Sequence, residues 1–324
     1  MLVASDLLIL SFTPELTQAG ITYTCHSLHH LITQEGNKDL TWLQCNVSEK
    51  AVELAFRRYL GAQGIPFGNL EHKPFTDPGL YDITLAGRHC DLRSCPIFRK
   101  DIIHRINIDS SYLLRMTALV PVDQLVSDFF NDADYYIFAF TTGLVTPRRV
   151  DIIRAQNAGL SIYLVHPLPL DWIRPSSWRP FGRLELESES DQPIMLEFGG
   201  QGADRQFQTE VIAIPSYQKV YAQGDFYMLA YVHVAEIPSG RVSIYSPGLK
   251  QVHMIRPYEW RNIWVYGMDI ILAGYITRAE FRRRCRHLPV SSQFERWKFP
   301  DAGVKAQGVL VSDLYPLKDL FSCH

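Results

Sequence analysis

The spacing of apolar and polar residues along the chain predicts a protein that mixes helices and strands. Residues 48–63 place apolar side chains on one face at helical spacing, with Ser48 as the N-terminal cap and Gly64 as the stop. Residues 134–140 are nearly all apolar, which is typical of a central strand covered on both faces. A second buried strand is expected at 161–165, after another helix. This order of elements predicts an α/β fold, more closely an α+β arrangement in which helices flank a mixed sheet.

The second half of the chain has a different pattern, because short apolar runs dominate it and only one strong helix is expected. Pro, Ser and Trp cluster without periodicity at 173–182, so we place a domain junction there, between residues 1–175 and residues 176–324. The capping box formed by Thr277 and Glu280 opens the helix at 278–287. The strands expected in this strand-rich α+β region are 183–187, 194–198, 210–214, 226–234, 242–245 and 263–265.

Two apolar segments on either side of that junction have similar sequences. Residues 134–140 read DYYIFAF and residues 225–231 read DFYMLAY. One interpretation is that the second domain is a degenerate repeat of the first. The other is that buried strands resemble one another because both of their faces are covered.

Composition places the chain among ordinary globular proteins, with 47% hydrophobic and 20% charged residues among 324. A net charge of -2 argues against a protein that coats nucleic acid, although a local basic groove is compatible with it. The six cysteines are dispersed without a C-x-x-C pair, which favours free thiols and a cytoplasmic location. The apolar segment 1–12 is interpreted as a buried strand, and no apolar run is long enough to span a membrane.

Residues 81–94 (YDITLAGRHCDLRS) predict a hairpin that carries the most informative chemistry of the chain. Asp82 opens its first strand, Asp91 lies in the second, and Arg93 shares a strand face with Asp91 because strand side chains alternate. Glu53, on the helix before the hairpin, can approach the same cluster. Two carboxylates beside a cation suit a divalent metal and a phosphate, since Mg²⁺ prefers one or two carboxylates plus water and substrate oxygens.

Residues 48–165 resemble the PD-(D/E)xK nuclease superfamily, which has the restriction-endonuclease-like fold. The resemblance rests on the Glu-bearing helix, the segment YDITLAGRHCDLR and the buried strand DYYIFAF. It implies a metal-dependent DNA endonuclease in which Asp82 and Asp91 bind Mg²⁺ or Mn²⁺ and Glu53 has an accessory role. Arg93 takes the position of the family's Lys. Because an arginine stays protonated, Arg93 can contact phosphate but cannot accept a proton.

Other interpretations of the same residues remain open at this point. Asp91 and Arg93 can form a simple surface ion pair, and Glu53 can pair with Arg57 four residues later on the helix. The chain would then be a non-catalytic nuclease-fold protein that acts as a nucleic-acid or protein interaction module. A third interpretation is a β-rich subunit of a larger assembly, with a homodimer or partner contact through the second half. The basic run 281–286 would meet a phosphate backbone or pair with nearby acids.

Overall fold

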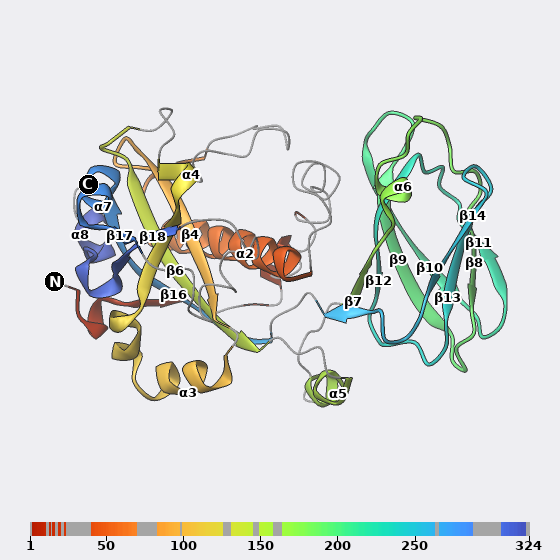
Figure 1. Ribbon diagram of the computed structural model, residues 1–324, viewed down its shortest axis with the longest axis horizontal. Helices are drawn as coiled ribbons and strands as arrows, with labels where there is room; N and C mark the ends of the chain where they lie inside the picture. The colour runs from red at the N-terminus through yellow and green to blue at the C-terminus, as the bar shows by residue number, and fades with distance from the viewer. Residues whose placement is uncertain are drawn as a thin grey trace. The chain divides into compact units, whose positions relative to one another are not determined.

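The structure is a computed structural model that divides the chain into two compact units (Figure 1). Unit 1 comprises Met1–Gly20, Thr41–Leu144 and Gly267–His324, and unit 2 comprises Ile21–Leu40 and Val145–Tyr266. The residues it describes are 2–10, 13, 15–16, 19–20, 23, 40–69, 83–97, 99–125, 131–144, 149–157, 164–262, 266–287 and 306–321. Unit 2 is thus inserted into unit 1, and the expected boundary at residues 175–176 does not coincide with the division.

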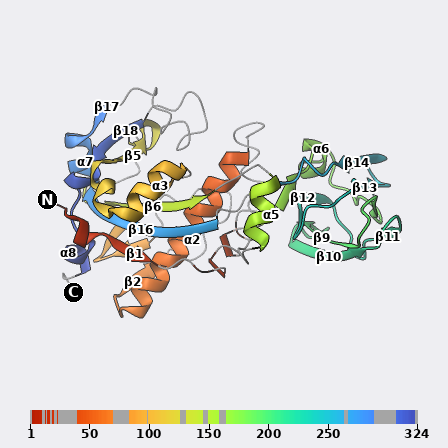
Figure 2. The same cartoon turned by 90° about the horizontal axis from the view of Figure 1, so that it is seen from below.

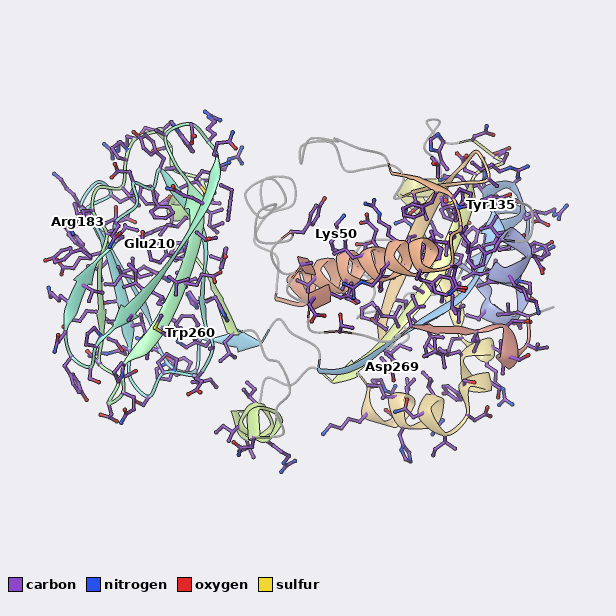
Figure 3. The ribbon with its side chains drawn as sticks, turned by 180° about the vertical axis from the view of Figure 1, so that it is seen from behind. Lys50, Tyr135, Arg183, Glu210, Trp260 and Asp269 are labelled. Carbon is purple, nitrogen blue, oxygen red and sulfur yellow. The ribbon has the colours of Figure 1, made fainter. Side chains whose placement is uncertain are left out.

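A six-stranded mixed sheet forms the centre of unit 1. Its strand order is β1 (Leu8–Leu10), β16 (Tyr266–Thr277), β6 (Tyr135–Leu144), β4 (Arg88–Ile97), β3 (Ile83–Leu85) and β2 (Phe67–Asn69). The expected hairpin is present as β3 and β4, which pair antiparallel, whereas β4 and β6 run parallel. The backbone N–H of Asp269 donates to Thr142 Oγ1 at 3.3 Å, which ties β16 to β6 (Figure 3). This pairing explains why the chain returns to unit 1 after residue 266.

Two apolar clusters cover the two faces of this sheet, in which β16 lies beside β6 (Figure 2). Helix α2 (Leu40–Ala62) buries Phe56 and Leu60 against one face, where Leu92 and Ile137 point. The other face packs against helices α3 (Lys100–Ile108) and α7 (Arg278–Arg284). Both neighbours of β6 in the sheet and both of its faces are therefore occupied, as its apolar sequence predicts.

Smaller elements close unit 1 around the chain ends. A three-stranded sheet is formed by β17 (Arg286–His287), β18 (Ala306–Leu310) and β5 (Thr117–Pro121). Strand β1 lies at the edge of the large sheet. Leu10 is buried and Ile9 is exposed, because neighbouring side chains of a strand point to opposite faces. The remaining short helices are η1 (Ala4–Asp6), η2 (Ser110–Arg115), α4 (Val122–Leu125), η3 (Val311–Asp313) and α8 (Leu317–Phe321).

Unit 2 consists mainly of two antiparallel sheets. The larger has the order β10 (Phe207–Ile214), β9 (Ile194–Gln201), β12 (Met228–Val234), β7 (Leu164–Pro167) and β15 (Arg261–Asn262). The smaller has the order β11 (Lys219–Tyr221), β8 (Glu185–Ser188), β13 (Val242–Ser246) and β14 (Gln251–Ile255). Phe198 and Phe226 are buried with their ring centroids 5.1 Å apart. Short helices α5 (Arg149–Asn157) and α6 (Leu170–Ile173) complete the unit.

The mixed α+β class expected from the sequence is confirmed, with 39% strand and 29% helix. The two similar segments give β6 in the mixed sheet of unit 1 and β12 in an antiparallel sheet of unit 2. Among the described residues, no helix is both long and apolar enough to cross a membrane.

Candidate functional site

Strand β4 carries the predicted pair Asp91 and Arg93 on one face. An Arg93 guanidinium N–H donates to Asp91 Oδ2, so the two side chains form a hydrogen-bonded ion pair. Asp91 is only 5% exposed and Arg93 is partly buried, so this is a largely buried pair and not the exposed surface pair considered from the sequence. A guanidinium therefore already holds one of the carboxylate oxygens that a metal would need.

The positive charge of a second arginine, Arg278, also acts on the Asp91 carboxyl. Arg278, the first residue of α7, is 1% exposed, and its guanidinium carbon lies 4.8 Å from the centre of the Tyr136 ring. Burial raises the pKa of the Asp91 carboxyl, and the positive charges of Arg93 and Arg278 oppose that shift. Asp91 is thus a buried acid whose charge depends on two neighbouring guanidinium groups.

Glu53 on α2 is buried, and two cations of the same helix pair with it. Its carboxylate oxygens lie 2.6 Å from Lys50 Nζ and 2.5 Å from an Arg57 guanidinium nitrogen (Figure 3 labels Lys50). The pairing with Arg57, four residues later, is the simpler interpretation considered from the sequence, and it is confirmed. The apolar side of α2 packs against Leu92, whereas Asp91 alternates with Leu92 on the strand. In the described part of the chain, Glu53 makes no direct contact with Asp91.

Glu49 is the residue of this region that sequence reasoning missed. It lies one helical turn before Glu53 on α2, and the charges of Asp91, Arg93 and Glu53 all act on its carboxyl. Burial raises the pKa of Glu49, Arg93 opposes the shift, and the carboxylates of Asp91 and Glu53 reinforce it. Glu49 nevertheless keeps exposed surface. We therefore regard its carboxyl as crowded by protein atoms yet reached by water. The i, i+4 spacing of Glu49 and Glu53 was the available signal.

Ser48 fixes the position of α2 on the sheet and does not cap the helix. Its Oγ lies 2.9 Å from Thr141 Oγ1 on β6, and both residues are buried. The prediction that Ser48 begins the helix was wrong, because α2 already starts at Leu40. The end was predicted well, since α2 stops at Ala62 and Gly64 has a left-handed φ of 66°.

Only one of the two residues predicted to bind a metal ion, Asp91, lies among the described residues. Asp82, one of the two predicted metal ligands, lies outside the described residues. Within the described ranges, no group of three or more His, Cys, Asp or Glu side chains could hold a metal ion. The donors near Asp91 have the chemistry that Mg²⁺ takes, but the described set alone does not fit one.

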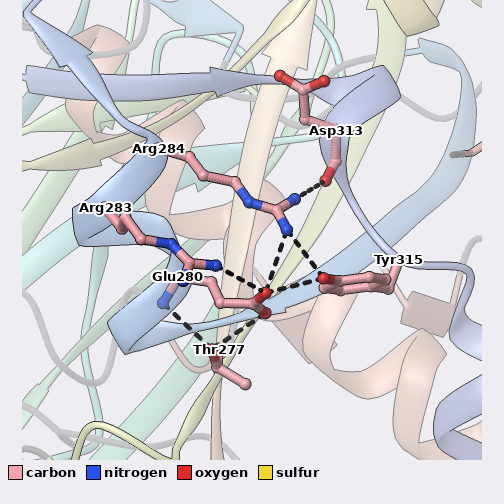
Figure 4. A network of polar contacts seen from close by, with 6 residues as sticks. All are labelled: Thr277, Glu280, Arg283, Arg284, Asp313 and Tyr315. Carbon is pink, nitrogen blue, oxygen red and sulfur yellow. Dashed lines mark hydrogen bonds and ion pairs between the residues drawn. The ribbon is translucent and has the colours of Figure 1, made fainter.

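Two acids pair with three arginines of the basic run at 281–286, as the second interpretation of that segment expects. Glu280 binds Arg284 at 3.1 Å and Arg283 at 3.5 Å (Figure 4). Arg282 pairs with Asp132. The capping box is also confirmed, since the backbone N–H of Glu280 donates to Thr277 Oγ1 at 3.2 Å. This helix therefore presents paired charges.

No protein-family model matches the chain, no curated protein is similar to it, and no solved structure matches it.

Proposed function

We propose that unit 1 is a restriction-endonuclease-like domain that acts as a non-catalytic interaction module for nucleic acid or protein. The order of its elements supports this proposal, because the Glu-bearing helix α2 precedes the hairpin β3–β4 and the buried strand β6 lies parallel to β4. The observation that carries the proposal is the buried ion pair between Asp91 and Arg93 on β4.

Internal cations take the place in which a metal would act. Arg93 forms an ion pair with Asp91, and Lys50 and Arg57 form ion pairs with Glu53. A divalent ion at Asp91 would compete with Arg93 for the carboxylate, and a hydrogen bond to a charged group of this kind contributes about 1.5–3 kcal/mol. Arg93 cannot replace the family's Lys as a proton acceptor, since a guanidinium stays protonated.

A second candidate function is the metal-dependent DNA endonuclease that the resemblance implies. The electrostatic grouping of Glu49 with Asp91 and Glu53 favours it, because mutually repelling carboxylates are stabilised by a divalent cation. Four cations surround these acids, which suits a phosphate: Lys50, Arg57, Arg93 and Arg278. In this candidate Mg²⁺ or Mn²⁺ would be held by Asp82 and Asp91 and would supply activated water.

The two candidates differ in their response to Mg²⁺ and Mn²⁺. We expect the full chain to leave supercoiled and linear DNA intact with either ion, and we expect its Tm to be unchanged by them. The Arg93→Lys variant keeps a cation beside Asp91 and restores the family's residue, with Arg241→Lys in unit 2 as a matched control for an ion-paired arginine. Metal-dependent cleavage by the wild-type chain that disappears in Asp91→Asn would contradict the proposal. Cleavage gained only in Arg93→Lys would identify a site that lost activity through this one residue.

A further inference from the structure

Strand β14 of unit 2 ends its sheet, so among the described residues no strand lies on its outer side. It lies last in the order β11, β8, β13 and β14, and it pairs antiparallel with β13 from Gln251↔Ser246 to Ile255↔Val242. In the described part of the chain, no backbone hydrogen bond joins β14 to any element other than β13. Its outer edge therefore offers backbone donors and acceptors to an added strand.

The outward side chains of β14 are apolar and exposed. Val252 is 60% exposed and Met254 is 44% exposed, and they lie opposite Tyr245 and Ser243 on the outer face of the sheet. Proteins usually protect such an edge with a charged residue, a proline or a bulge. Residues 251–255 read QVHMI, and their pairing with β13 has no register shift, so β14 lacks all three devices.

Positive charges stand at both ends of this strand. Lys250 precedes it and Arg256 follows it; both are exposed, and neither forms an ion pair with another described residue. The Arg256 guanidinium donates to Tyr258 Oη at 2.7 Å, which holds that charge beside the strand end. The nearby Arg241 is neutralised by two hydrogen bonds to Glu189. Residues 250–256 span about 20 Å when extended.

The inward side of β14 is fixed, which keeps the edge in its strand conformation. Ile255 is fully buried, and the Nε2 atom of His253 lies 2.9 Å from the Nε2 atom of His166 on β7. A preformed strand pays little conformational entropy when a peptide pairs with it.

We propose that the edge of β14 binds an extended acidic peptide by strand addition. Alternate apolar side chains of the peptide contact Val252 and Met254, and an acidic residue at each end meets Lys250 or Arg256. A second copy of this chain fits the edge less well. Antiparallel pairing of two β14 strands would place Lys250 of one copy beside Arg256 of the other, and like charges opposite each other repel. This inference concerns unit 2 and is independent of the function proposed for unit 1.

The test uses the full chain and a labelled peptide, Glu-Thr-Ile-Thr-Val-Thr-Glu, blocked at both ends, whose two Glu residues share a strand face with Ile and Val. Fluorescence anisotropy should give saturable binding that weakens at least tenfold when both Glu residues are replaced by Lys. N-methylation of alternate peptide amides should abolish binding, because strand addition needs those N–H groups. Hydrogen exchange of the wild-type chain should slow at residues 251–255 when the peptide is present.

Two exposed valines on edge strands provide the matched variants. Val252→Glu removes an apolar contact and places a negative charge on the outer face of β14, so it should reduce binding of the acidic peptide at least tenfold. Val211→Glu makes the same change on β10, an edge strand of the other sheet, where Val211 is 55% exposed, and should leave binding unchanged. Absence of saturable binding, or equal binding by the Val252→Glu variant, would overturn the proposal. A dimer in sedimentation analysis that Val252→Glu dissociates would also overturn it and assign the edge to a second copy.

Discussion

The contact between His166 and His253 makes unit 2 sensitive to acid. His166 lies on β7 and His253 on β14, so their rings join the two sheets through Nε2 atoms 2.9 Å apart. Because His166 Nδ1 lies 3.3 Å from the carbonyl oxygen of Glu259, that nitrogen donates its proton there. His166 Nε2 is then an acceptor, and His253 Nε2 donates to it. A proton added to His166 Nε2 would face the N–H of His253, whereas a proton added to His253 itself would enter at Nδ1.

Burial and the neighbouring His166 lower the pKa of His253 from 6.5 to about 4. At about 1.4 kcal/mol per pH unit, this difference corresponds to about 3 kcal/mol for a fully buried group. Because His253 is only half-buried, solvent screening reduces the effect, and we expect about 1–2 kcal/mol. The unfolded chain binds the proton below pH 6.5, whereas the folded chain does not bind it until about pH 4. Stability is therefore complete above pH 6.5 and falls as the pH is lowered toward 4.

The His253→Gln variant removes this titration and keeps an N–H group that can donate to His166. Urea unfolding of the full chain, followed by tryptophan fluorescence, should show a smaller loss of stability between pH 7 and pH 4.5 in the variant. Trp172 and Trp260 report on the pair, since their rings lie 6.2 Å from His253 and 6.1 Å from His166.

A second histidine of unit 2 makes the comparison with wild type necessary. Burial also lowers the pKa of His233, so part of the acid loss should persist in His253→Gln. An NMR titration of the His253 ring supplies the direct measurement. A His253 pKa near 6.5, or equal pH dependence in the two proteins, would refute the reasoning.

Other substitutions test the packing and the helix ends. A Cβ atom on Gly200 would lie 2.0 Å from the carbonyl oxygen of Met228, so Gly200→Ala should lower the free energy of unfolding by about 3 kcal/mol, measured by urea titration. Gly61→Ala, at a helical position with no atom within 4 Å of the added carbon, is the matched control and should raise stability by about 0.5 kcal/mol. Thr277→Ala removes the cap of α7 and should cost about 1 kcal/mol in the same assay, with Thr277→Ser close to wild type. Equal effects of the two glycine variants, or of the two threonine variants, would contradict these assignments.

Local patterns predicted the elements whose signals lie within a few residues of one another. The hairpin β3–β4, the apolar face of α2, the doubly covered strand β6 and the cap at Thr277 all follow from neighbouring residues. The insertion of unit 2 could not be found in this way, because β16 pairs with β1 across most of the chain. Ser48 shows the same limit, since its hydroxyl contacts Thr141, which is 93 residues away.

The candidate site was predictable as a set of residues but not as a set of contacts. The spacing of Asp91 and Arg93 fixed their shared strand face, and the spacing of Glu53 and Arg57 allowed their pairing. Whether these cations pair with the acids or lie beside a ligand depends on tertiary packing. The influence of Arg93 on Glu49 likewise arises only when α2 packs on the sheet.

The insertion of unit 2 also determines the order in which the two units can fold during synthesis on the ribosome. Strands β1 and β6 are made early, but β16, which lies between them in the sheet, follows only after Val145–Tyr266. Synthesis proceeds at about 5–20 residues per second, so the edges of β1 and β6 stay open for several seconds or longer. During that interval unit 2 can complete its own sheets, whereas unit 1 must wait. We expect nascent chains halted before residue 266 to expose the apolar faces of unit 1 and to recruit chaperones.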